Sequence, residues 1–131
     1  MMKKNLLYVM LVFTTFKLSA SDIELTELSE VDVYSMGFNG FIAEKMPQQI
    51  LYEKVFREKN AVALFKKILN EDSATPESKL FAACGLWHKG LSSEIVIKKE
   101  FEGLSATVLT GDILRNEALP AFLLRIKQVG C

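Results

Sequence analysis

The sequence predicts a mainly helical fold, either an irregular antiparallel bundle or a short stack of helix pairs. Apolar residues recur at intervals of three and four along several segments, which is the spacing of one face of an α-helix. Pro47, Pro76 and Pro120 each stand at the start of such a segment, and the first turn of a helix tolerates the missing N–H of proline. Short connections between these segments favour antiparallel neighbours.

The first two predicted helices follow each other closely. Pro47 begins one of them, whose apolar face is Ile50, Leu51, Val55 and Phe56. Asn60 suits the N-cap of the next, because its side chain can accept a hydrogen bond from a free N–H of the first turn. The apolar face of this second helix comprises Val62, Leu64, Phe65, Ile68 and Leu69.

Thr75-Pro76 is the clearest helix start in the chain. The threonine hydroxyl can accept from an N–H of the first turn, and the proline has no N–H there to leave unpaired. Gly90 is a natural stop for this helix. A last helix begins near Pro120 and presents a further apolar face, made of Leu119, Phe122, Leu123 and Ile126.

For three segments the sequence leaves more than one secondary structure open. Residues 23–36 mix the helical and the strand period, so they predict either a short helix or an extended arm. Residues 92–101 predict a helix, with a strand at 95–97 as the alternative because these residues are β-branched. Residues near 105–110 predict one short β segment, and the alternative for them is an ordered loop. In the helix-pair alternative for the fold, the pairs stack side by side as they do in HEAT or tetratricopeptide repeats.

Residues 1–20 have the pattern of a secretory signal peptide. Lys3 and Lys4 precede an apolar run from Leu6 to Phe13, and Ser19-Ala20 supplies small residues for a peptidase. We therefore expect export to the periplasm or the medium, with contact to a membrane only during passage. The organisation that follows is a signal peptide at 1–20, an acidic segment with a glycine-rich turn at 21–45, and a helical domain at 46–131.

Removal of the leader makes a neutral chain mildly acidic, because Lys3, Lys4 and Lys17 leave with it. Such a product is a poor nucleic-acid binder, and we expect no nucleic-acid partner. The acids gather near the new N-terminus and either form a solvated surface or attract a cationic partner. The residues we single out for the second alternative are Asp22, Glu24 and Glu27.

Two aromatic residues flank a predicted turn between Gly37 and Gly40. Phe38 and Phe41 are either tucked into the core or presented to a partner, since large apolar groups on a turn serve one of these two purposes. We take both as candidate partner-binding residues.

Cys84 and Cys131 are the two cysteines of the chain. In an oxidising compartment they can form a single disulfide, and the alternative is a buried thiol at Cys84 with an exposed one at Cys131. Their distant positions match no redox motif and no zinc motif. We therefore expect no metal and no cofactor.

The chain carries no recognisable catalytic motif, and His88 is its one histidine. A catalytic role would require a carboxylate brought to His88 by the fold, and no neighbouring residue supplies a nucleophile. We therefore expect a small non-enzymatic binding protein for a protein or peptide partner, such as an inhibitor or an immunity protein. The alternatives are a structural subunit of an envelope assembly and a small enzyme that uses His88.

The leader gives the first testable prediction. Because peptidases cut after small residues, the exported protein should begin at Ser21. N-terminal sequencing of the protein from the exported fraction checks this. A membrane-bound product that still begins with Met1 would contradict it.

Overall fold

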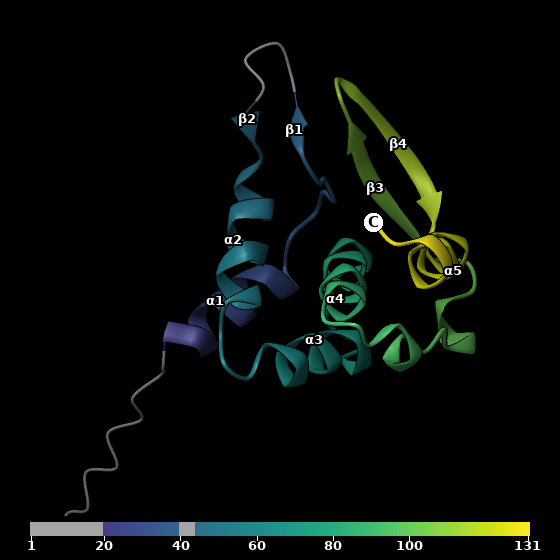
Figure 1. The fold of residues 1–131 in the computed structure, drawn as a ribbon. Coiled ribbons are helices and arrows are strands. Elements are labelled where there is room, and N and C mark those ends of the chain that lie inside the picture. The colour runs from purple at the N-terminus through teal and green to yellow at the C-terminus, as the bar shows by residue number, and fades with distance from the viewer. Residues whose placement is uncertain (1–19, 40–43) are drawn as a thin grey trace, which may run out of the picture.

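The computed structural model describes residues 20–39 and 44–131 (Figure 1). The apolar run of the predicted signal peptide and Phe41 lie outside the described residues. Within these ranges the chain forms five α-helices, two short 3₁₀ helices and two two-stranded antiparallel sheets. The fold is therefore mainly α with a short β segment, as the sequence predicts. In chain order the elements are α1 (Ala20–Ser29), β1 (Phe38–Asn39), β2 (Glu44–Lys45), α2 (Pro47–Phe56), α3 (Ala61–Asn70), α4 (Pro76–His88), η1 (Ser92–Glu94), η2 (Lys99–Phe101), β3 (Ser105–Thr110), β4 (Ile113–Ala118) and α5 (Leu119–Val129).

Helix α4 lies at the centre of the molecule. Each of its residues from Glu77 to Leu86 is buried, and α1, α2, α3, α5 and β3 all pack against it (Figure 1). A helix can be enclosed in this way only when it offers apolar or small residues on every side. The expected start is confirmed, since the Thr75 hydroxyl accepts a hydrogen bond from the Ser78 N–H. Thr75 also donates its own N–H to Ser29 O at 3.0 Å, which joins α4 to the end of α1.

A glycine lets α3 approach α4 closely. Gly85 stands inside α4, three residues before its end, where a Cβ atom would overlap the buried ring of Phe65 on α3. Glycine is an unfavourable residue inside a helix, by roughly 1 kcal/mol relative to alanine. Its presence here is explained by the space that the Phe65 ring occupies.

Within the described residues, Lys79 is the charged side chain that reaches into the interface between α3 and α4. Its ammonium donates hydrogen bonds to Ile68 O at 2.8 Å and to Glu71 O at 2.6 Å, where α3 ends. The last carbonyls of a helix have no partner within the helix, so the lysine satisfies them and meets the negative end of the dipole. Burial lowers the pKa of Lys79, the expected direction for an ammonium removed from water.

The C-terminal part of the chain forms a β-hairpin and a helix. β3 pairs with β4 from Ser105↔Ala118 to Thr110↔Ile113, and Leu119 then begins α5. The sequence pointed to the first strand but not to the second. The reason is that nearly all of β4 is exposed, so its sequence ILRNEA lacks the apolar alternation by which a half-buried strand is recognised.

Between α4 and β3 the structure corrects the expectation for residues 92–101. The segment forms the short 3₁₀ helices η1 and η2 rather than an α-helix or a strand at 95–97. Ile95 and Phe101 are buried anchors of this connection. Lys127 of α5 holds it in place by donating a hydrogen bond to Ile95 O at 3.1 Å. Isolated apolar anchors, with no continuous stripe, explain why no regular element forms.

Both alternatives predicted for residues 23–36, a short helix and an extended arm, are confirmed in part. The chain is helical to Ser29 and extended afterwards, and Tyr34 forms a parallel bridge with Val108 of β3. The Tyr34 N–H donates to Thr107 O and the Leu109 N–H donates to Tyr34 O, both at 2.9 Å. Tyr34 and Leu28 are buried in the same core as α4, so the acidic segment and the helical domain share one core.

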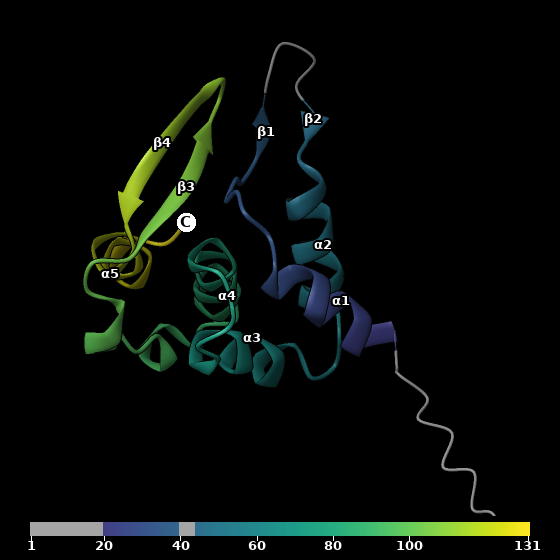
Figure 2. The same cartoon turned by 180° about the vertical axis from the view of Figure 1, so that it is seen from behind.

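The apolar face expected for α2 is partly wrong. Val55 is buried as predicted, but Ile50 is 43% exposed, and Gln49 and Tyr52 take the inner positions. Gln49 is inside because its amide oxygen accepts the Gly37 N–H at 2.8 Å. This partly buried hydrogen bond accounts for the inward position of Gln49. α1 packs against α2 (Figure 2).

The close approach at Gly85 gives a stability prediction. Gly85→Ala should lower the free energy of unfolding by about 1–2 kcal/mol, because overpacking outweighs the gain in helix propensity. Urea denaturation measures this change. The control is the Phe65→Leu background, in which the same substitution should cost less because the ring is gone. An increase in stability for Gly85→Ala in the otherwise unchanged protein would refute the packing argument.

Candidate functional site

A disulfide joins Cys84 of α4 to Cys131, and their Cα atoms are 5.7 Å apart. This is the bridged alternative left open by the sequence. Gly130 makes the approach possible: its φ is 88°, a conformation that favours glycine, and a Cβ atom there would overlap the Trp87 ring. The chain therefore leaves α5, crosses Trp87 at close range and reaches Cys84.

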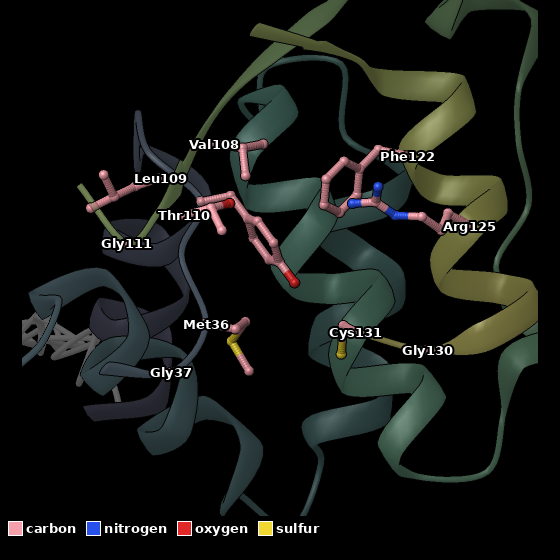
Figure 3. A pocket seen from close by; sticks show the side chains of 11 residues that line it. Met36, Gly37, Val108, Leu109, Thr110, Gly111, Phe122, Arg125, Gly130 and Cys131 are labelled. Atoms are coloured by element: carbon pink, nitrogen blue, oxygen red, sulfur yellow. The ribbon is translucent and has the colours of Figure 1, made fainter. Parts of the chain in front are cut away.

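A pocket of about 410 Å³, here called the central pocket, opens beside the disulfide (Figure 3). Four parts of the chain contribute to it: the segment before β1, the hairpin, α5 and the C-terminal residues. Its lining residues are Tyr34, Met36, Gly37, Val108, Leu109, Thr110, Gly111, Phe122, Arg125, Gly130 and Cys131.

Two side chains give the central pocket its polar character. Arg125 places its guanidinium carbon 4.1 Å from the centroid of the Phe122 ring, so that the cation lies across the ring (Figure 3). Tyr34 is buried against the rings of Phe81 and Phe122, with centroids at 4.8 and 5.5 Å. Burial raises the pKa of Tyr34, and the nearby Tyr52 adds to this, while Arg125 opposes it. The phenol therefore stays protonated and able to donate a hydrogen bond.

A second pocket, here called the aromatic pocket, lies on the other side of Met36. Its volume is about 470 Å³, and its lining residues are Met36, Tyr52, Glu53, Phe56, Arg57 and His88. His88 stands edge-on to Phe56 and to Trp87, with ring centroids at 6.2 and 5.0 Å. Met36 lines both pockets and is therefore the side chain that joins them.

Hydrogen bonds fix the backbone next to Met36. The Gly37 N–H is bound by Gln49, whose amide group also donates to Glu53 at 3.4 Å. Lys45 of β2 completes the group with an ion pair to Glu53 at 2.7 Å. This hydrogen bond from Lys45 is the main cause of a lowered pKa at Glu53, which keeps the carboxylate charged. The wall shared by the two pockets is thus tied to α2.

His88 lies close to the disulfide. One donor atom from each of Cys84, His88 and Cys131 lies within 4.8 Å of the others. Cys131 lines the central pocket and His88 lines the aromatic pocket, so this cluster also stands between the two. Sequence reasoning weighed His88 and the cysteines separately and gave no reason to expect them together.

The predicted acidic residues of α1 are not among the residues that line these two pockets. Asp22 and Glu27 are exposed on α1, and Glu24 is partly buried there. Glu27 lines a different pocket between α1 and α2, to which Lys54 also contributes. Phe38 belongs to β1, and Phe41 lies outside the described residues.

Sequence reasoning missed Tyr34, Met36 and Arg125. Tyr34 falls in a stretch of mixed period, and Arg125 sits among the apolar residues of α5 as many solvent-facing arginines do. Nothing in their spacing marks them, because they meet only when the hairpin, α5 and residues 34–37 fold against one another.

In the described part of the chain, every helix is too short or too polar to cross a bilayer.

The disulfide generates a stability prediction. The bond closes a loop between residues 47 positions apart, which corresponds to about 4 kcal/mol in the chain-entropy model. A Cys84→Ser, Cys131→Ser variant should lose stability of that order in urea denaturation. The matched control is reduced wild-type protein, which should resemble the double variant. Free thiols in unfolded, unreduced wild-type protein would contradict the bond itself.

Comparison of the chain with known family models, curated protein sequences and solved structures finds no match.

Proposed function

We propose that this chain is a small exported, non-enzymatic binding protein that engages a protein or peptide partner through the central and aromatic pockets. The observation that carries the proposal is the pair of open pockets joined at Met36. Their walls come from elements tied together by a disulfide, by Gln49 and by the bridge at Tyr34. Such a prearranged surface lowers the entropy cost of binding.

The charges of the pockets support a partner of one kind. Among the described residues, Arg125 is the one charged side chain that lines the central pocket. In the aromatic pocket Arg57 and His88 accompany Glu53, whose carboxylate is already engaged by Lys45. Tyrosine, phenylalanine and methionine supply the apolar surface. This combination suits a segment of the partner that carries an acidic side chain beside a large apolar one.

The exposed acids of α1 offer a separate surface for the inhibitor or immunity version of this function. Asp22 and Glu27 are positioned to attract a basic cleft of a target enzyme, and such attraction mainly raises the rate of association. The pockets would then hold the partner once it has arrived.

The surroundings of His88 support binding over catalysis. Its ring contacts are with Phe56 and Trp87, and the carboxylate in its pocket, Glu53, is paired with Lys45. A general base requires a group that orients it and a reacting group within hydrogen-bond reach. The aromatic surroundings supply neither role.

A second candidate function is favoured by the hairpin. Nearly every residue of β4 is exposed, and Leu114 is 62% exposed. None of the other described strands pairs with the outer edge of β4. An open strand edge with apolar side chains is a site for pairing with another strand, as in an assembly subunit.

Two arginine variants test the proposal. The purified protein is used to capture its partner from the native exported fraction, and calorimetry then measures the affinity. Arg125→Ala should weaken binding by about tenfold or more, which is about 1.4 kcal/mol, because an acidic group of the partner loses its counterpart. Arg115→Ala is the matched control, since Arg115 is exposed on β4 and lines neither pocket.

Equal affinities for the two variants would refute the pocket as the binding site. If Leu114→Asp lowers the affinity for the partner and Arg125→Ala does not, the binding site is the edge of β4. Urea denaturation of each variant separates lost contacts from lost stability.

A further inference from the structure

We propose that Cys84, His88 and Cys131 form a zinc site when the disulfide between the two cysteines is reduced. The proposal rests on the observation that one donor atom from each residue lies within 4.8 Å of the other two. Two thiolates and one imidazole are a ligand set that zinc uses in proteins, with a fourth position left for water. This inference is independent of the proposed function.

The backbone places the three donors suitably. Cys84 and His88 are four residues apart on α4, so their side chains project from the same face of the helix. Helical ligands at this spacing are a recurrent arrangement at zinc sites. The third donor arrives from a distant part of the chain, because Gly130 lets Cys131 pass over Trp87. The helix supplies two ligands and the chain after α5 supplies one.

The chemistry requires a change in the redox state of the cysteines. A dithiol reductant passes two electrons and two protons to the Cys84–Cys131 bond, which breaks to give two thiols, while the reductant becomes a disulfide. Zinc then binds both sulfurs as thiolates and displaces the two protons to solvent. His88 binds through a neutral imidazole nitrogen. Charge and atoms balance with the reductant and the metal as the only additions.

The surroundings of the cluster fit a metal site. The Tyr52 hydroxyl donates a hydrogen bond to Cys84 Sγ at 3.8 Å, an outer contact of the kind that orients a sulfur ligand. Cys84 is buried, whereas His88 and Cys131 are exposed. The aromatic pocket reaches His88 and the central pocket reaches Cys131, so a metal ion can approach from solvent. Zinc would keep the residues after α5 attached to α4 after the covalent bond is lost.

The experiment uses the whole exported chain, reduced with a phosphine that is then removed under anaerobic conditions. Co²⁺ serves as the spectroscopic probe, and Zn²⁺ is titrated against it. Reduced wild-type protein should bind one equivalent of Co²⁺ with thiolate-to-cobalt charge-transfer absorption, and Zn²⁺ should displace it. The oxidised protein should show no such absorption. Zinc should also raise the melting temperature of the reduced protein, since it binds the folded form.

His88→Ala is the decisive variant, because the residue is exposed and its loss leaves both cysteines in place. It should weaken zinc binding by more than about tenfold, since even outer-shell partners of a metal change affinity by that much. Lys89→Ala, its exposed neighbour, is the matched control and should bind as the wild type does.

Two results would overturn the proposal. One is zinc binding of equal strength in His88→Ala and wild type. The other is reduced wild-type protein that shows neither charge-transfer absorption nor stabilisation by zinc. If reduction unfolds the chain, far-UV circular dichroism tests the proposal instead, because zinc should then restore the helical signal.

Discussion

The burial of α4 on all sides is the constraint on which the rest of the structure depends. An enclosed helix needs partners around its whole circumference, and α1, α2, α3, α5 and β3 supply them. Gly85 gives the Phe65 ring room to lie against the backbone of α4. Burying the charge of Lys79 in such a place would cost folding free energy, but its ammonium donates hydrogen bonds to the free carbonyls at the end of α3. The centre of the molecule is thus closely packed, and its buried ammonium is satisfied in its hydrogen bonds.

The position of α4 also explains where the pockets lie. Its last turn carries Trp87 and His88, with Cys84 one turn earlier. Trp87 lies against Gly130 of the chain after α5, and Cys84 and His88 lie beside Cys131. The segment at Tyr34 pairs with β3 of the hairpin, and both line the central pocket. The central and aromatic pockets form where these covering segments converge around Met36. A rigid core therefore presents surfaces built from segments far apart in the chain.

The predictable part of the fold consists of elements with one buried face. α3 and α5 have clear apolar stripes, and α4 has a capped start at Thr75, so all three could be recognised. α2 was found at Pro47, but its orientation was not, because Gln49 turns inward to bind Gly37. β4 could not be found, since an exposed strand carries no apolar period and is defined by its pairing with β3.

The sequence by itself determined the helical class and the boundaries of the helices with apolar stripes, and it limited the two cysteines to one disulfide or two thiols. Those features depend on local spacing, on capping chemistry and on a count of cysteines. Only the tertiary structure decided that Cys84 and Cys131 are joined, that His88 lies beside them, and that Tyr34 and Arg125 line one pocket. These relations depend on how α4 is covered by distant segments, and spacing along the chain carries no record of such contacts.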